Sequence, residues 1–324
     1  MRTDRPLVSI VTPVLNRART ILGTLESVAA QTYPYLEHIV VDGGSTDGTL
    51  EILEGFAHLF PYRFVSGHDG GMYEAIGKGF AMARGEVLAY LNSDDRSLPW
   101  SVTSSVGALA EGADVVFGDL GVVIEREPRA AFQVQFYPPF DLRYYTWVTT
   151  LGQPTVFWRR EVTERIGGFD TSYRLLGDCE YWLRAAVAGA RFRHLREITA
   201  LQLEHPGTLR ATRPDEMAAE LERLRAAYGP HAGRPRPIAD GANRRLRWRL
   251  TQTRLLAASR RRDPHTWSRF LSFLREERIP VRPSYLAWHM VPRGLRSDGV
   301  TLVDAERLLD ALQRRSRDAR DLAA

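Results

Sequence analysis

Cysteine and long apolar runs are nearly missing from this sequence of 324 residues. Cys179 is the only cysteine, which excludes an intramolecular disulfide and a thiolate-rich zinc site and fits a reducing compartment. No run approaches the roughly 18 apolar residues that a membrane-spanning helix needs. The N-terminal apolar segment is short, contains Pro13 and lacks a cleavage site, so it is a poor signal peptide. We therefore expect a cytoplasmic protein.

Lysine is almost absent as well, since Lys78 is the only lysine among 44 basic residues. Residues 1–205 hold 19 basic and 25 acidic residues, net −6, whereas residues 206–324 hold 25 and 14, net +11. The pattern beyond His205 changes to Arg-rich helical segments, interrupted by a linker-like stretch at 229–237. We therefore expect one domain over 1–210 and a helical, basic extension over 211–324.

Apolar runs rich in β-branched residues alternate with helical patterns in the first hundred residues. The runs lie at 7–15, 36–44 and 85–95, and the helical patterns at 18–32 and 49–60. This alternation predicts an α/β fold with a largely parallel sheet covered by helices.

Later segments extend this pattern. Residues 114–137 predict further strands with a hairpin around 125–129. Residues 154–170 predict a strand that leads into a helix, and 178–189 predict another helix; each helix ends at a glycine.

Polar residues end the three apolar runs. Asn16 follows the first, Asp42 ends the second, and Asp94 and Asp95 end the third. In open sheets of this kind the ligand crevice lies outside the carboxyl ends of the strands, so these residues should converge there. Mg²⁺ and Mn²⁺ take oxygen ligands and are shared with substrate phosphates, so one or two carboxylates suit a nucleotide-diphosphate site.

The chain resembles the family 2 glycosyltransferases of GT-A fold, especially the branch that makes bacterial cell-surface polysaccharides. The motifs that carry the resemblance cover residues 7–208 and leave the tail uncovered: VSIVTPVLNRARTILGTLESVAAQTYP, HIVVDGGSTDGT, DGGMYEAIGKGFAMARGEVLAYLNSDD, GQPTVFWRREVTERIGGFD, GDCEYWLRAAVAG and EHPGT. The resemblance implies inverting, metal-dependent transfer of a sugar from a nucleotide-diphosphate sugar, with a UDP-sugar favoured. The implied acceptor is a glycan or lipid-linked hydroxyl.

The resemblance also implies a donor site. Asp42 would accept the imide hydrogen of a uracil-like base, although an Asx turn into the following glycines explains the same residue. Residues 13–16 would shape the base pocket. Lys78 could meet the diphosphate, but a solvated helix-face lysine fits equally well. The donor residues implied are Pro13, Val14, Asn16, Asp42, Asp69, Lys78, Asn92 and Asp94.

The implied metal site consists of Asp95 and His205, with Asp94 contacting ribose or metal. Asn92 stands where the family often has an acid. A lone histidine near a loop is usually a surface or core residue, so the assignment of His205 as a metal ligand depends on its EHPGT motif. An imidazole makes Mn²⁺ slightly more favoured than Mg²⁺.

Asp178 matches the aspartate that removes the acceptor's proton in inverting members of the family. Its alternative role is to cap the helix that begins there. Glu180 is the other candidate base, and Gly177 replaces the acid that often precedes the base. Gln153, Trp158, Trp182 and the aromatic residues of 144–147 could form the acceptor side or pack in the core.

The tail segment 244–262 combines arginines with Trp and Leu, which suits an anionic membrane surface. Packing of this segment on the acidic catalytic domain explains it equally well, and we expect no nucleic-acid partner. A nucleotidyltransferase is disfavoured because no glycine-rich phosphate loop is present. A glycan-binding protein without turnover should lack the base or the metal ligands, and this chain retains Asp95, Asp178 and His205.

Overall fold

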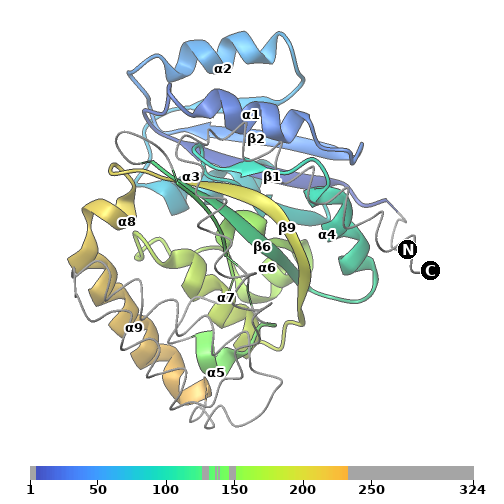
Figure 1. Ribbon diagram of the computed structural model, residues 1–324, viewed down its shortest axis with the longest axis vertical. Coiled ribbons are helices and arrows are strands. Elements are labelled where there is room, and N and C mark those ends of the chain that lie inside the picture. Colours follow the sequence, from blue (N-terminus) through green and yellow to red (C-terminus); the bar gives the residue numbers. More distant parts are fainter. Residues whose placement is uncertain (1–4, 126–130, 136, 138, 146–150, 233–324) are drawn as a thin grey trace.

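The computed structural model describes residues 5–125, 131–135, 137, 139–145 and 151–232 (Figure 1). Its strands are β1 (Val8–Val14), β2 (Leu36–Asp42), β3 (Arg63–Ser66), β4 (Val87–Tyr90), β5 (Arg96–Ser97), β6 (Val115–Ile124), β7 (Ala131–Gln135), β8 (Phe157–Arg159) and β9 (Phe192–Glu204). Its helices are α1 (Ile21–Ala29), α2 (Thr49–Ala57), α3 (Met72–Met82), α4 (Ser101–Ala110), α5 (Leu142–Tyr145), α6 (Arg160–Ile166), α7 (Gly177–Val187), α8 (Leu209–Thr212) and α9 (Pro214–Ala232), with a 3-10 turn η1 (Gln153–Thr155).

The described strands form one mixed sheet in the order β3-β2-β1-β4-β8-β6-β9-β5, and β7 pairs with β6. β3, β2, β1 and β4 each run parallel to their neighbours in this order, with Val8 of β1 opposite Leu36 of β2 and Val87 of β4. β8 then runs antiparallel to β4 and β6, while β6 is parallel to β9. The parallel half confirms the predicted alternation of strands and helices, and the whole is an α/β fold.

Alternate side chains of the parallel strands enter layers on opposite faces of the sheet. Val11 and Ile39 join a core cluster that also contains residues of α3, α6 and α7. Val14 and Val40 pack instead against α1 and α2. Figure 1 shows α1 and α2 at one end of the molecule and α5 and α9 toward the other. The period of two in the strands thus gives a sheet with helices on both faces.

Some predicted boundaries differ from the structure. The helix predicted at 18–32 begins only at Ile21, because the Arg17 carbonyl first closes a turn by accepting the Thr20 and Ile21 N–H groups. The hairpin of β6 and β7 is confirmed, although its turn at 126–130 lies outside the described residues. The thirteen-residue strand β9 was not predicted.

Helix α9 begins beyond the predicted domain boundary at 210 and covers the start of the linker-like stretch 229–237. Leu224 of this helix is 2% exposed and belongs to the same core cluster as α7. The division at 210 stays a prediction, since residues 233–324, with segment 244–262, lie outside the described residues. Within the part of the chain that the structure describes, no helix is both long and apolar enough to cross a membrane.

Candidate functional site

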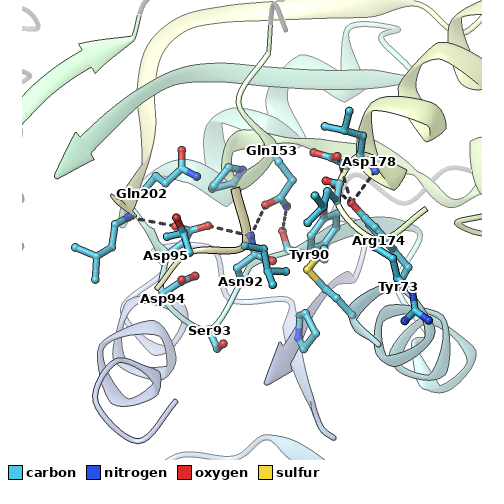
Figure 2. A pocket seen from close by; sticks show the side chains of 18 of the residues that line it. Tyr73, Tyr90, Asn92, Ser93, Asp94, Asp95, Gln153, Arg174, Asp178 and Gln202 are labelled. Carbon is cyan, nitrogen blue, oxygen red and sulfur yellow. Dashed lines mark hydrogen bonds between the residues drawn. The ribbon is translucent and has the colours of Figure 1, made fainter. Parts of the chain in front are cut away.

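A cavity of about 580 Å³ lies beyond the carboxyl ends of β1 and β4 and is bordered by α3, α7, the end of β9 and segment 208–217. Figure 2 shows that Asp94 and Asp95 lie on one side of it and Asp178 on the other. The sequence-predicted residues that line it are Pro13, Val14, Asn16, Asp69, Asn92, Asp94, Asp95, Gln153 and Asp178. The predicted residues Asp42, Lys78 and His205 are not among the lining residues.

Asp95 anchors the turn that follows β4. Its side chain is 1% exposed, and its carboxylate accepts the Leu203 N–H at 3.3 Å and the Asn92 amide at 3.2 Å (Figure 2). Its backbone carbonyl accepts the Thr24 hydroxyl at 2.8 Å. Asp95 therefore ties the end of β4 to both β9 and α1.

Asp94 faces the histidine that follows β9. The Asp94 Oδ2 atom lies 3.5 Å from His205 Nε2, and both side chains are largely buried, at 18% and 12% exposed. The Gly207 N–H donates to His205 Nδ1 at 3.1 Å, so a neutral ring carries its proton on Nε2. His205 Nε2 is buried and makes no hydrogen bond to the described residues.

This pair offers one carboxylate and one imidazole to a divalent cation. Both donor types suit Mn²⁺, and the buried, unsatisfied Nε2 atom is a fitting ligand position. A metal there would require the proton to move to Nδ1 and the Gly207 contact to break. Among the described residues no group of three or more His, Cys, Asp or Glu is arranged to hold a metal, so further ligands would come from the donor diphosphate or water.

Asp42 is fully buried at the end of β2. Its carboxylate accepts the Gly44 N–H at 2.9 Å, the Ser66 hydroxyl at 2.6 Å, and both the N–H and hydroxyl of Ser45. Burial raises the pKa of Asp42, but these hydrogen bonds outweigh it and hold the pKa below its ordinary value. The contacts match the turn interpretation, and the contact with a base stays a prediction.

Asn16 connects the β1 and β2 loops. It adopts a left-handed backbone with φ of 52°, which asparagine tolerates better than most residues. Its side-chain oxygen accepts the Thr46 N–H at 2.8 Å, and its own N–H donates to the Ser45 hydroxyl at 2.7 Å. The wall of the cavity beside β1 is thus held by the Asp42 turn.

The two residues predicted from the DGGMYEAIGKG motif are placed differently. Asp69 lines the cavity, and its carboxylate accepts the Gly71 N–H at 2.9 Å. Lys78 is exposed, pairs with Glu74 at 3.0 Å and donates to the His68 carbonyl at 3.2 Å. These contacts fit the helix-face interpretation of Lys78, while its approach to a diphosphate stays a prediction.

Asp178 lies in the first turn of α7, opposite Tyr73 of α3 (Figure 2). The Tyr73 hydroxyl donates to Asp178 Oδ1 at 3.3 Å and accepts the Asp178 N–H at 3.1 Å. The Cys179 N–H also donates to this carboxylate, at 2.8 Å. Burial, followed by the charge of Asp178, raises the pKa of Tyr73 well above its ordinary value, so the phenol keeps its proton.

Gly177 makes room for this tyrosine. A Cβ atom at position 177 would lie 2.7 Å from the Tyr73 ring, which is closer than two non-bonded carbon atoms approach one another. The space that a side chain at position 177 would need is therefore filled by the Tyr73 ring.

Glu180, the alternative base, is engaged away from the cavity. Its carboxylate accepts both Nε and a terminal nitrogen of Arg184, at 2.9 and 2.8 Å, and the Tyr228 hydroxyl at 2.5 Å. It is 5% exposed and is not a lining residue. Of these two carboxylates, Asp178 lines the cavity and Glu180 does not.

The suggested acceptor residues separate into two groups. Trp158 and Trp182 are fully buried in the core, and Tyr145 is 4% exposed, so packing explains them. Gln153 lines the cavity, donating to the Tyr90 carbonyl at 2.8 Å and accepting from Asn92 at 3.2 Å. Residues 146 and 147 lie outside the described residues.

Several lining residues were missed from the sequence. Tyr73 lies inside a quoted motif, but helical spacing alone does not show that it meets a residue 105 positions later. Gln202 belongs to the unpredicted strand β9, and Arg213 and Met217 belong to the segment assigned to the extension. Tyr73 and Gln202 lie within 7–208, so only the family resemblance over that range could have pointed to them.

Comparison with known proteins identifies the family. Residues 9–167 match the profile described as Glycosyl transferase family 2. A PGL/p-HBAD biosynthesis glycosyltransferase of Mycobacterium tuberculosis is 33% identical over 184 residues, which are 55% of this chain and 69% of that protein. A second glycosyltransferase of that organism is 35% identical over 193 residues, covering 57% of this chain and 71% of its own.

Solved structures share the fold at lower identity. The mannosyltransferase PcManGT from Pyrobaculum calidifontis, in complex with GDP-Man and Mn²⁺, aligns with a TM-score of 0.56 at 20% identity, covering 90% of this chain and 85% of its own. S. aureus TarS 1–349 in complex with UDP-GlcNAc gives 0.56 at 19% identity, covering 76% and 72%. These likenesses establish the GT-A fold. With the sequence relatives, they show that this chain is a glycosyltransferase and belongs to glycosyltransferase family 2.

Proposed function

We propose that this glycosyltransferase moves a sugar, with inversion, from a nucleotide-diphosphate sugar to a hydroxyl of a glycan or lipid-linked acceptor in cell-surface polysaccharide synthesis. The observation that carries the proposal is one cavity that has Asp94, which faces His205 at 3.5 Å, on one side and the Tyr73-held Asp178 on the other. A single carboxylate on the acceptor side is sufficient for inversion, because only one proton has to be removed.

Asp178 acts as the base. It accepts the proton of the acceptor hydroxyl while that oxygen forms its bond to the anomeric carbon and the bond to the diphosphate breaks. Attack comes from the face opposite the leaving group, so the configuration inverts. The Tyr73 and Cys179 contacts on Oδ1 fix the carboxylate's direction.

Asp94 and His205 would hold Mn²⁺ or Mg²⁺, which would offset the negative charge of the departing diphosphate. Our sequence-based prediction gave the carboxylate ligand role to Asp95. The contacts favour Asp94, because it lies 3.5 Å from His205 Nε2, while Asp95 is 1% exposed and anchors the turn. Asp95 then acts by holding Asp94 in place.

The nucleoside would lie along the wall formed by Pro13, Val14 and Asn16, with a UDP-sugar favoured. A base that donates to Asp42 would have to displace the Ser45 or Ser66 hydroxyl from its carboxylate. Asn92 Oδ1 is buried and makes no hydrogen bond to the described residues, so it is suited to accept a ribose or sugar hydroxyl. Neighbours of this fold in complex with UDP-GlcNAc and GDP-Man support a nucleotide-sugar donor.

The basic segment 244–262 would bind the anionic inner face of the plasma membrane, where a lipid-linked acceptor is presented. Its packing on the catalytic domain is the competing arrangement. The net charges of −6 for residues 1–205 and +11 for residues 206–324 are compatible with both.

A donor screen tests the proposed activity. Nucleotide release by the full chain is measured from UDP-GlcNAc, GDP-mannose and dTDP-sugars with Mn²⁺, and again in excess EDTA. We expect release from one donor class, loss of most of it with EDTA, and a similar loss in Asp94→Ala and His205→Ala. Full activity in EDTA would overturn the metal proposal, and Asp95→Ala retaining more metal affinity than Asp94→Ala would support the revised ligand.

A further inference from the structure

One face of α9 packs on the core. Met217, Leu221, Leu224 and Tyr228 recur at helical spacing and pack on the cluster that contains α7. Glu220 lies on this same face and is 8% exposed, although glutamate is rarely buried without partners. A buried carboxylate in an apolar contact requires hydrogen bonds that offset the loss of water.

The partners of Glu220 are three consecutive backbone N–H groups in the segment that leads into α7. Its carboxylate accepts the N–H of Arg174 at 2.5 Å, of Leu175 at 3.0 Å and of Leu176 at 2.7 Å. Leu176 is the N-cap residue of α7, and its own side chain makes no capping hydrogen bond. Glu220 therefore supplies from α9 the acceptor for the backbone N–H groups that lead into α7, which the side chain of its N-cap residue cannot supply.

Other α9 side chains hold the same region. Arg223 contacts Ser172 Oγ at 2.6 Å and Asp170 at 3.3 Å, and its guanidinium lies 4.0 Å from the Tyr173 ring centre. The Tyr228 hydroxyl donates to Glu180 at 2.5 Å, and Glu180 lies about half a helical turn after Asp178 in α7. Helix α9 thus holds both the approach to α7 and its first turn.

Asp178 lies two residues beyond the last backbone group that Glu220 binds. We infer that Glu220 is a positioning residue for Asp178, and that α9, which follows the predicted boundary at 210, belongs to the catalytic unit. The inference rests on the proposed role of Asp178 as base. Loss of the Glu220 carboxylate would leave three N–H groups without their acceptor, so residues 174–178 would shift. The nucleoside wall on β1 and β4 would stay in place.

The test compares Glu220→Gln with Glu222→Gln in the full chain. Glu222 is the matched control, since it lies on the same helix, is 73% exposed and pairs only with Arg225 among the described contacts. The amide introduced by Glu220→Gln presents an NH₂ group to backbone donors and cannot accept all three. Nucleotide release with the donor found by the screen gives kcat and KM, calorimetry gives donor affinity, and thermal unfolding reports folding.

We expect Glu220→Gln to lower kcat about 10- to 100-fold, because misplacement of a catalytic group by about 1 Å has effects of this size. Donor affinity should stay near wild type, and Glu222→Gln should match wild type throughout. If Glu220→Gln does not fold, Glu220→Asp, which keeps the charge but withdraws it by one methylene, is judged by the same criteria.

Wild-type kcat in folded Glu220→Gln, a parallel loss of donor affinity, or failure of both variants to fold would overturn the inference. Absence of turnover by the wild type, or full turnover by Asp178→Asn, would instead contradict the proposed function. The two failures are therefore distinguishable.

Discussion

At the scale of single residues, the Tyr73 hydroxyl meets both the side chain and the backbone of Asp178. We expect Tyr73→Phe to lower kcat about 10-fold or more, because the carboxylate is then free to turn away from the acceptor. Tyr62→Phe is the control, since its hydroxyl donates to the Leu53 carbonyl at 2.5 Å, away from the cavity. Steady-state kinetics of both variants compare them, and equal kcat values would show that Tyr73 does not orient the base.

His38 gives the fold a dependence on pH. It is buried on β2, contacts the Thr12 hydroxyl at 2.9 Å, and burial lowers its pKa from 6.5 to about 3. Between these two pKa values the folded chain keeps His38 neutral while the unfolded chain takes up a proton. The contribution of His38 to the free energy of unfolding is therefore fully present above pH 6.5 and decreases as the pH drops toward about 3.

Between these two pH values the free energy of unfolding should change with pH, through His38, by up to about 1.4 kcal/mol per pH unit. Urea unfolding of wild type and His38→Gln at several pH values from 7 to about 4 measures it. The free energy of unfolding should depend less on pH in the variant. Parallel curves for the two proteins would mean that His38 does not titrate on unfolding.

At the scale of elements, two helical glycines with opposite surroundings test the contact between α3 and α7. A Cβ at Gly177 would meet the Tyr73 ring at 2.7 Å, whereas nothing lies within 4 Å of one at Gly77 in α3. We expect Gly177→Ala to destabilise the fold by about 1–3 kcal/mol through overpacking. Gly77→Ala should stabilise it by up to about 1 kcal/mol through helix propensity.

Denaturant unfolding of both alanine variants gives these values, with nucleotide release measured on the same samples. Gly177→Ala should also lose activity, because the displaced tyrosine holds Asp178. A Gly177→Ala protein as stable and active as wild type would contradict the described contact.

The elements of the parallel half could be predicted because their signal is local. Apolar runs such as 7–15 are separated by amphipathic segments, and acids at strand ends converge at one edge of a parallel sheet. β9 was missed because its first half alternates poorly, with charged Arg193 and Arg196 between half-buried residues. Side-chain partners such as Glu220 with residues 174–176 depend on packing between distant elements, which no local pattern encodes.

At the scale of the whole molecule, the basic tail should determine where the enzyme acts. We expect the full chain to sediment with vesicles of anionic lipid but not with neutral vesicles, since each arginine near the surface contributes about 1 kcal/mol. A chain ending at residue 232 keeps α9 and should remain in the supernatant. Replacement of Arg260, Arg261 and Arg262 by glutamine should weaken sedimentation. Equal sedimentation of the full and shortened chains would exclude the tail as the anchor.

In the proposed reaction one carboxylate, Asp178, removes the acceptor's proton. Asp178→Asn measures it most directly, because the amide keeps the shape and the contact with Tyr73 but cannot take up the proton. Product formation and calorimetric donor affinity are measured on the same sample. We expect kcat to fall about 100-fold or more while donor affinity stays nearly unchanged. Turnover by Asp178→Asn near the wild-type rate would contradict it and place the base elsewhere.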